Sequence, residues 1–141
     1  MQKKTSDLLK ELTAENADIS EYIASNPDSF INGNIKDYWE GIIDKSGLTK
    51  SSIINKSDFS YCYFYDIING RKIPGKDKVV RLILAMKLSL DDCQDALRIS
   101  SKSALYPKIK RDSILIFALN NSPSIYETND LLTKHGEEQF K

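Results

Sequence analysis

Apolar residues at helical spacing constrain this chain of 141 residues more than any other feature. One face of a helix is marked by four apolar residues at the spacing i, i+4, i+7 and i+8, namely Ile35, Trp39, Ile42 and Ile43. Similar spacing recurs along most of the chain, and no segment alternates apolar and polar residues as a half-buried strand does. The sequence therefore predicts an all-α fold.

Capping and stop signals divide the middle of the chain into five helices. Thr49, Ser60 and Ser89 are residue types that favour helix N-caps. Gly47 and Gly70 stand just past the ends of expected helices, where a left-handed backbone is common. These signals predict helices over about residues 35–46, 50–57, 61–69, 76–86, and from 90 to 97 or 99.

Further helices are expected on both sides of these five. Residues 1–34 predict a helical arm of two helices, with leucines along one face of the first and a stop before Pro27. We expect this arm to pack on the main domain. The expected organisation is an N-terminal helical arm (1–34), a five-helix domain (35–100) and a C-terminal helical hairpin (101–141) with helices near 109–120 and 124–134.

The C-terminal hairpin resembles the helical pair that precedes it. Leu82-Ile-Leu-Ala-Met86 aligns with Leu115-Ile-Phe-Ala-Leu119, and the stretch 89–95 aligns with 124–130. The two matches differ in offset by two residues, which fall in the loop between the helices, where insertions are tolerated. Two helical hairpins stacked side by side fit this pattern. Chance similarity between two amphipathic pairs fits it as well.

Charge is distributed unevenly, although the net charge of the chain is zero. Residues 1–49 carry a net charge of −4, residues 50–111 of +7, and residues 112–141 of −3. A basic segment between acidic ends can still attract a polyanion, because exposed charges more than about 8 Å apart are largely screened.

The segment 108–112 reads as the solvated start of a helix.

Several classes of function are not expected from this sequence. Cys62 and Cys93 are far apart and read as two reduced thiols, and the only histidine, His135, stands at an expected helix end. We find no phosphate-binding glycine loop, zinc-protease motif or nucleophile elbow. No stretch reaches the roughly 20 apolar residues of a membrane span, and no secretory signal is visible. We therefore expect no enzyme activity, no catalytic or metal site, no cofactor, no membrane partner and a cytoplasmic location.

The stretch GLTKSSIINKSDFSYCYFYDIINGRKIPG, which begins at Gly47, carries a resemblance to a known family. It resembles the Cro/repressor-type helix-turn-helix family, also called the XRE or lambda-repressor-like family. The family pattern aligns without a gap, and the residues that match it outright are Gly47, Leu48, Thr49, Ser60, Ile67, Asn69, Gly70 and Pro74. The remainder of the chain is similar to an uncharacterised bacterial subgroup of this family with N- and C-terminal extensions. The resemblance implies a five-helix domain and a bacterial DNA-binding transcriptional regulator, expected to be a homodimer on double-stranded DNA.

The resemblance also implies which residues meet DNA, because the outward face of the third helix enters the major groove in this family. At 100° per residue, Tyr63 and Phe64 fall on the core side of that helix. Lys50 stands where the family has a glutamine that often touches a phosphate, and Asp58 replaces the glycine of the turn. The candidate DNA-binding residues are Lys50, Ser60, Tyr61, Cys62, Tyr65, Asp66, Arg71 and Lys72.

The same helix supports a second hypothesis. Its outward face has no lysine or arginine, so the phosphate contacts would come from surrounding cations that include Lys56, Lys76 and Lys78. Tyr61 and Tyr65, four residues apart, form an aromatic patch, and tyrosine is enriched at protein interfaces. The alternative function is therefore a protein–protein interaction module built on a helix-turn-helix scaffold, with a protein partner on the tyrosine face.

Overall fold

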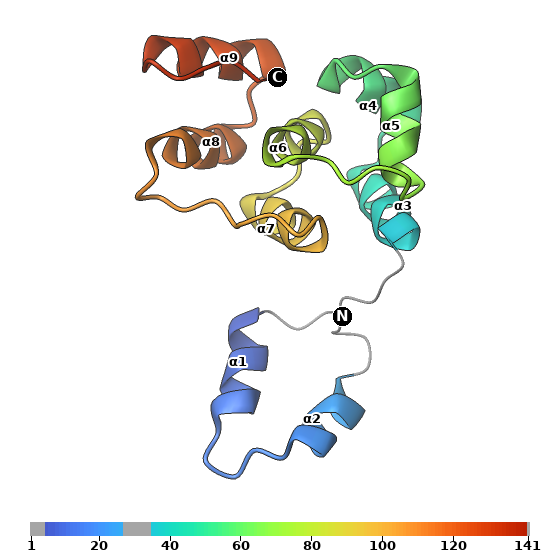
Figure 1. The fold of residues 1–141 in the computed structure, drawn as a ribbon, viewed down its shortest axis with the longest axis vertical. Coiled ribbons are helices and arrows are strands. Elements are labelled where there is room, and N and C mark those ends of the chain that lie inside the picture. The colour runs from blue at the N-terminus through green and yellow to red at the C-terminus, as the bar shows by residue number, and fades with distance from the viewer. Residues whose placement is uncertain (1–4, 27–34, 141) are drawn as a thin grey trace. The chain divides into compact units, whose positions relative to one another are not determined.

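The computed structural model describes residues 5–26 and 35–140 (Figure 1). These residues form helices and no strand, which confirms the predicted all-α class. The chain divides into two compact units, residues 1–33 and residues 34–141. The helices are α1 (Thr5–Thr13), α2 (Ile19–Ser25), α3 (Ile35–Ser46), α4 (Lys50–Ser57), α5 (Tyr61–Ile68), α6 (Lys76–Ala85), α7 (Leu90–Ile99), α8 (Lys110–Asn121) and α9 (Ile125–Lys134).

The first unit consists of α1 and α2, as predicted for the N-terminal arm. The Asp18 carboxylate caps α2 by accepting a hydrogen bond of 2.8 Å from the Ser20 N–H. Neither helix buries any of its own residues, and Leu9 and Ile23 are exposed. Residues 1–4 and 27–34 of the predicted arm lie outside the described residues. Packing of the arm on the main domain stays a prediction.

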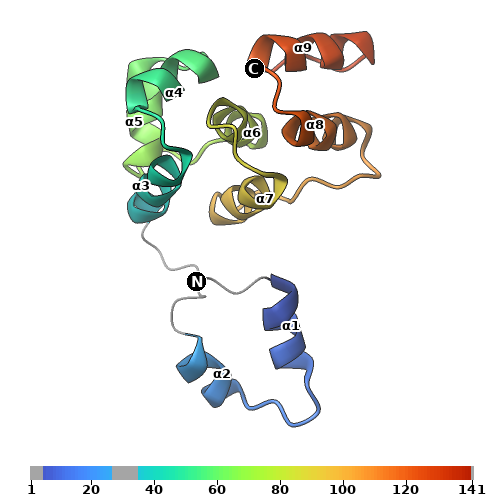
Figure 2. The same cartoon turned by 180° about the vertical axis from the view of Figure 1, so that it is seen from behind.

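The second unit is organised around α6. Figures 1 and 2 show this helix between α4 on one side and α8 on the other, and it also packs against α7. Every residue of α6 from Val79 to Ala85 is buried. A run that is buried on all sides and apolar except for Arg81 identifies a central helix. The C-terminal hairpin of α8 and α9 packs on α6, so residues 35–100 and 101–140 share one core.

Local capping interactions place the helix ends where the sequence predicted them. The Thr49 Oγ1 accepts a hydrogen bond of 3.1 Å from the Ser52 N–H, and the Ser60 Oγ accepts one of 3.2 Å from the Tyr63 N–H. Ser89 forms a capping box with Asp92 at the start of α7. Gly70 has a positive φ of 78° just past α5, a conformation that glycine adopts at no steric cost.

Two crossed ion pairs join the N-terminal ends of α6 and α8. The Lys76 Nζ lies 3.0 Å from the Asp112 Oδ2, and the Arg111 Nη2 lies 2.7 Å from the Asp77 Oδ2. Asp112 is buried and also accepts a hydrogen bond of 3.0 Å from the Tyr106 N–H. The prediction that segment 108–112 is a solvated helix start is therefore wrong at Asp112, because the charges of α6 and α8 pair across the interface.

No helix in residues 5–26 or 35–140 has both the length and the apolar character needed to cross a membrane. The described parts of the chain also contain no group of three or more His, Cys, Asp or Glu side chains arranged to hold a metal ion.

Candidate nucleic-acid interface

Helices α4 and α5 follow one another with a short connection. The last residue of α4 is Ser57 and the first residue of α5 is Tyr61, so residues 58–60 connect them. Asp58 has a left-handed backbone with a φ of 60°, and its N–H donates to the Asn55 carbonyl at 3.3 Å. This conformation is uncommon for residues other than glycine, but aspartate tolerates it better than most. Asp58 therefore supplies the left-handed residue of the turn between α4 and α5.

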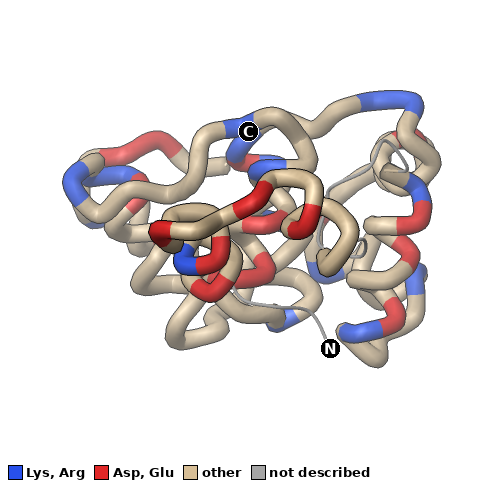
Figure 3. Tube along the Cα trace, turned by 90° about the horizontal axis from the view of Figure 1, so that it is seen from below, with Lys and Arg blue, Asp and Glu red and all other residues tan. Residues whose placement is uncertain are grey.

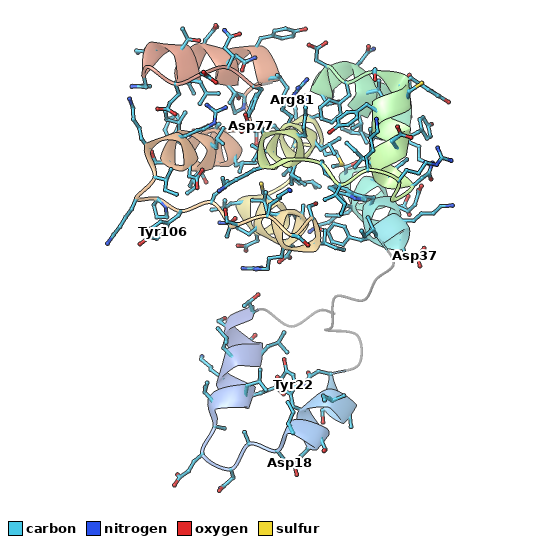
Figure 4. All side chains as sticks on the ribbon, in the orientation of Figure 1. Asp18, Tyr22, Asp37, Asp77, Arg81 and Tyr106 are labelled. Carbon is cyan, nitrogen blue, oxygen red and sulfur yellow. The ribbon has the colours of Figure 1, made fainter. Side chains whose placement is uncertain are left out.

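A buried arginine donates hydrogen bonds to the backbone carbonyls of this turn. Arg81 of α6 is 6% exposed, and its Nη2 donates to the Ser57 carbonyl at 2.7 Å and to the Asp58 carbonyl at 3.1 Å (Figure 4). Its guanidinium carbon lies 4.6 Å from the centroid of the Phe59 ring. Burial lowers the pKa of Arg81. A cation at these carbonyls also complements the negative end of the α4 dipole, so Arg81 couples the central helix to the turn.

Sequence reasoning did not select Arg81 as an important residue. A signal was present, since Arg81 is the one charged residue inside the run 79–85 of α6. A charged side chain within an apolar run must pair with polar groups if it is buried. What the run does not reveal is that the partners are backbone carbonyls 23 and 24 residues earlier.

The inner face of α5 packs into the core as predicted. Phe64 and Ile67 are fully buried, and Ile68 is nearly so. Tyr63, predicted on the same side, is only half-buried, and its ring meets the Phe59 ring edge-on at 5.4 Å. The helix is therefore anchored by three apolar side chains and leaves its other face toward solvent.

The outward face of α5 is more varied than the sequence predicted. Tyr61 is 66% exposed and Cys62 is exposed, but Tyr65 and Asp66 are half-buried. The Tyr61 and Tyr65 ring centroids lie 4.5 Å apart with an interplanar angle of 40°. A hydrogen bond with Tyr65 is the main cause of a raised pKa at Tyr61. Tyr65 in turn packs edge-on against the buried Phe64 ring at 5.4 Å. The two outward tyrosines thus act as a connected pair, which we call the tyrosine pair.

Carboxylates pair with three cations near α5. The Lys50 Nζ lies 3.0 Å from the Glu40 Oε1, and this hydrogen bond raises the pKa of Lys50. Asp66 receives two cations that follow the helix, Arg71 Nη1 and Lys72 Nζ, each at 3.5 Å. Figure 3 shows that basic and acidic residues are also interspersed along the rest of the chain. Asp66 therefore positions two of the predicted DNA-binding cations and partly offsets their charge.

Cations also lie over the aromatic rings beside the turn. The Lys78 Nζ is 5.6 Å from the Tyr63 centroid and 5.7 Å from the Phe59 centroid, and the Lys72 Nζ is 5.7 Å from the Tyr63 centroid. Burial is the main cause of a lowered pKa at Lys78, and the nearby Arg81 contributes. Lys78 therefore lies beside the turn and beside Tyr63 of α5.

The structure assigns Lys76 to a different place. Its ammonium group donates to Asp112, to the Ser103 Oγ at 3.1 Å and to the Ala104 carbonyl at 3.4 Å. These contacts bind it to the loop before α8 and to α8 itself. The prediction that Lys76 belongs with the cations around α5 is wrong, because a buried carboxylate captures it.

Comparisons with family models, with curated proteins and with solved structures each found no match to this chain. The function of the α4–α5 surface is therefore inferred from its own residues and their contacts.

Proposed function

We propose that this chain binds double-stranded DNA through α5, as a bacterial transcription regulator of the Cro/repressor type with the five-helix domain of that family. The observation that carries the proposal is that three residues connect α4 to α5 and that Tyr61 and Cys62 on one face of α5 are exposed, an arrangement that resembles a helix-turn-helix unit. In such units the second helix lies in the major groove and the first crosses the backbone.

The charge of this region supports contact with phosphates. Residues 50–81 carry seven basic and three acidic side chains, a net charge of +4. Lys50 and Glu40 each keep 36% of the side chain exposed, and an exposed ion pair contributes at most about 1 kcal/mol. A phosphate can therefore replace Glu40 as the partner of Lys50 at little cost. Ser60, at the start of α5, has a hydroxyl that can also reach a phosphate.

Base contacts in this proposal come from the outward face of α5. Tyr61, Cys62 and Tyr65 offer two hydroxyls, a thiol and apolar ring edges that suit a thymine methyl group. Asp66 can accept from cytosine N4, and it also holds Arg71 and Lys72 beside the helix. Two copies of the chain would bind two half-sites about 34–36 Å apart, so the regulator acts as a homodimer in the cytoplasm. Operator binding would then block or recruit RNA polymerase.

The test is a salt titration of binding to random and genomic duplex DNA, in which fluorescence anisotropy measures the bound fraction. We expect binding at about 50 mM salt that weakens steeply toward 200 mM. Lys50→Gln should weaken binding on every sequence and reduce the salt slope by about 1. Lys134→Gln on α9 is the matched control, since Lys134 is an exposed lysine at the far end of the chain from α5. Absence of binding at about 50 mM salt would reject the proposal.

A specific observation favours the second candidate, a protein–protein interaction module. Tyr61 on α5 is 66% exposed, α5 contains no lysine or arginine, and Asp66 offsets the charges of Arg71 and Lys72. Tyrosine is a common hot spot of protein interfaces. In that case, replacing Tyr61 and Tyr65 with alanine abolishes capture of a protein partner and leaves DNA binding intact. The opposite result, lost DNA binding with unchanged partner capture, would eliminate the module.

A further inference from the structure

We propose that Tyr61 and Tyr65 form a stacking platform for an unpaired nucleobase, so that α5 binds single-stranded or locally opened nucleic acid. The inference rests on the proposed nucleic-acid binding by α5 and deepens it, because it names the state of the ligand. It starts from the side chains that this helix offers to a ligand.

The outward face of α5 has little with which to read base edges. From Tyr61 to Ile68 the helix contains no arginine, lysine, asparagine or glutamine, the residues that make bidentate contacts to guanine and adenine in the major groove. It contains three tyrosines and a phenylalanine instead. Bases in a duplex present their edges to the groove, while their faces are covered by neighbouring bases. Ring faces on a protein are therefore of most use to a base that has left the stack.

The geometry of the tyrosine pair suits that use. The two ring centroids are 4.5 Å apart, within the range of aromatic pairs that attract one another. Tyr65 is held from behind by the fully buried Phe64, whose ring lies perpendicular to it at 5.4 Å. Tyr61 rests on Tyr65 and keeps 66% of its surface exposed. The pair thus combines a ring that is held in place with a ring that is accessible. Because the two rings already contact each other, binding of a base costs little side-chain entropy.

The charges beside the pair indicate a nucleotide rather than a neutral aromatic ligand. The Lys50 Nζ lies 5.9 Å from the Tyr65 centroid, so a cation stands next to the platform. The surrounding segment 50–81 has a net charge of +4. A nucleotide carries a π face and a negative phosphate on one unit, which matches both features. An aromatic side chain of a partner protein matches only the first.

The experiment measures binding of the full chain to a labelled oligo(dT) of about 20 nucleotides, to a duplex of the same length, and to an oligo-glutamate of matched charge. We expect the single strand to bind the wild-type chain. Tyr61→Ala should weaken this binding roughly 5- to 150-fold, the range expected for loss of one stacked base. Tyr61→Phe should retain it, because the ring face remains. Tyr126→Ala is the matched control, since Tyr126 on α9 is 69% exposed, and it should have no effect.

Each alternative result has a definite meaning. Binding of the duplex without the single strand overturns the platform and leaves the proposed DNA-binding function in place. Binding of neither overturns both proposals. Equal losses for Tyr61→Phe and Tyr61→Ala overturn the platform, because the hydroxyl and not the ring would then carry the contact. Equal, Tyr61-dependent binding of oligo-glutamate also overturns it, because the face would then recognise charge alone.

Discussion

The α6–α7 and α8–α9 hairpins align in sequence but differ in burial. Each second helix begins with a capping box, Ser89 with Asp92 in α7 and Ser124 with Glu127 in α9. The first helices share the pattern of their apolar residues, yet Leu84 of α6 is 3% exposed and its aligned counterpart Phe117 of α8 is 57% exposed. Helix formation and capping are thus common to the two hairpins, whereas the burial of their side chains depends on where each hairpin lies in the fold.

The difference follows from the neighbours of each helix. Helix α6 has α4, α7, α8 and α9 around it, whereas α8 packs on α6, α7 and α9 and leaves one side open (Figures 1 and 2). The open side forms a shallow pocket of about 620 Å³, lined by residues that include Leu90, Ile116 and Phe117. Similar sequences therefore build a central helix in one place and a surface helix in another.

The largest expected contrast concerns the aligned positions 84 and 117. Leu84→Ala should lower the free energy of unfolding by about 2–5 kcal/mol, because it leaves a cavity in the core. Phe117→Ala should change it by less than about 0.5 kcal/mol, because the side chain is largely in solvent. Urea unfolding followed by circular dichroism measures both. Similar losses at the two positions would contradict the difference in burial.

The next contrast concerns Arg81, which aligns with the half-buried Ile114 of α8. Arg81→Met should destabilise the chain by about 1.5–3 kcal/mol, because the Ser57 and Asp58 carbonyls lose a charged donor. Urea unfolding measures the loss. Arg81→Lys, which keeps the charge but not the planar fork, should recover only part of the stability. A neutral or stabilising Arg81→Met would show that the turn does not depend on this residue.

The capping boxes offer a test of what the hairpins share. Ser89→Ala and Ser124→Ala should each cost about 1 kcal/mol of stability, because each removes the acceptor for a backbone N–H at the start of a helix. Ser→Gly at the same positions should cost only a few tenths of a kcal/mol. Thermal unfolding of the four variants provides the comparison. A loss at one serine and none at the other would mean that the two hairpins are not locally equivalent.

A smaller effect is expected from Asp92, whose Oδ1 lies 2.7 Å from the Lys45 Nζ. Burial raises the pKa of Asp92, but hydrogen bonds from Lys45 and Ser89 outweigh it and hold the pKa below its ordinary value. The ionised form therefore stabilises the native state above the unfolded pKa of about 3.9, and this contribution is lost as pH falls through the lower native pKa.

Asp92→Asn should accordingly cost about 0.5–1 kcal/mol at pH 7 and less at about pH 2.5. Urea unfolding at the two pH values measures the change. Glu127→Gln, at the equivalent position of the other capping box, is the control that separates the box from the Lys45 pair. A loss from Asp92→Asn that is the same at both pH values would show that ionisation of Asp92 does not contribute.

The last contrast leaves stability unchanged and concerns the two thiols. Cys93 aligns with Thr128, and both are fully buried. Burial raises the pKa of Cys93 to about 12, so its reactive thiolate is scarce at pH 8. Cys62 is exposed on α5. A disulfide reagent at pH 8 should therefore titrate one thiol per chain rapidly and the second only after unfolding. Rapid reaction of both would mean that α7 opens readily.

Whether a feature could be predicted from sequence depends on how many residues separate the interacting groups along the chain. The Ser60 cap joins residues three apart, so its residue type and position were enough to place the start of α5. The partners of Lys76 and Arg81 lie 23 to 36 residues away along the sequence, and no local pattern identified them.

The candidate site follows the same rule. The sequence placed Tyr61 and Cys62 on the outward face of α5, because 100° per residue determines the side of a helix. It did not reveal that Tyr65 is held by Phe64 or that Asp66 binds Arg71 and Lys72, because those contacts depend on how far each side chain leans toward its neighbours. The sequence by itself determined the helices, their caps and the side of α5 that meets solvent. Only the tertiary structure decided which charges remain available there, because ion pairs form between elements that the sequence does not place in space.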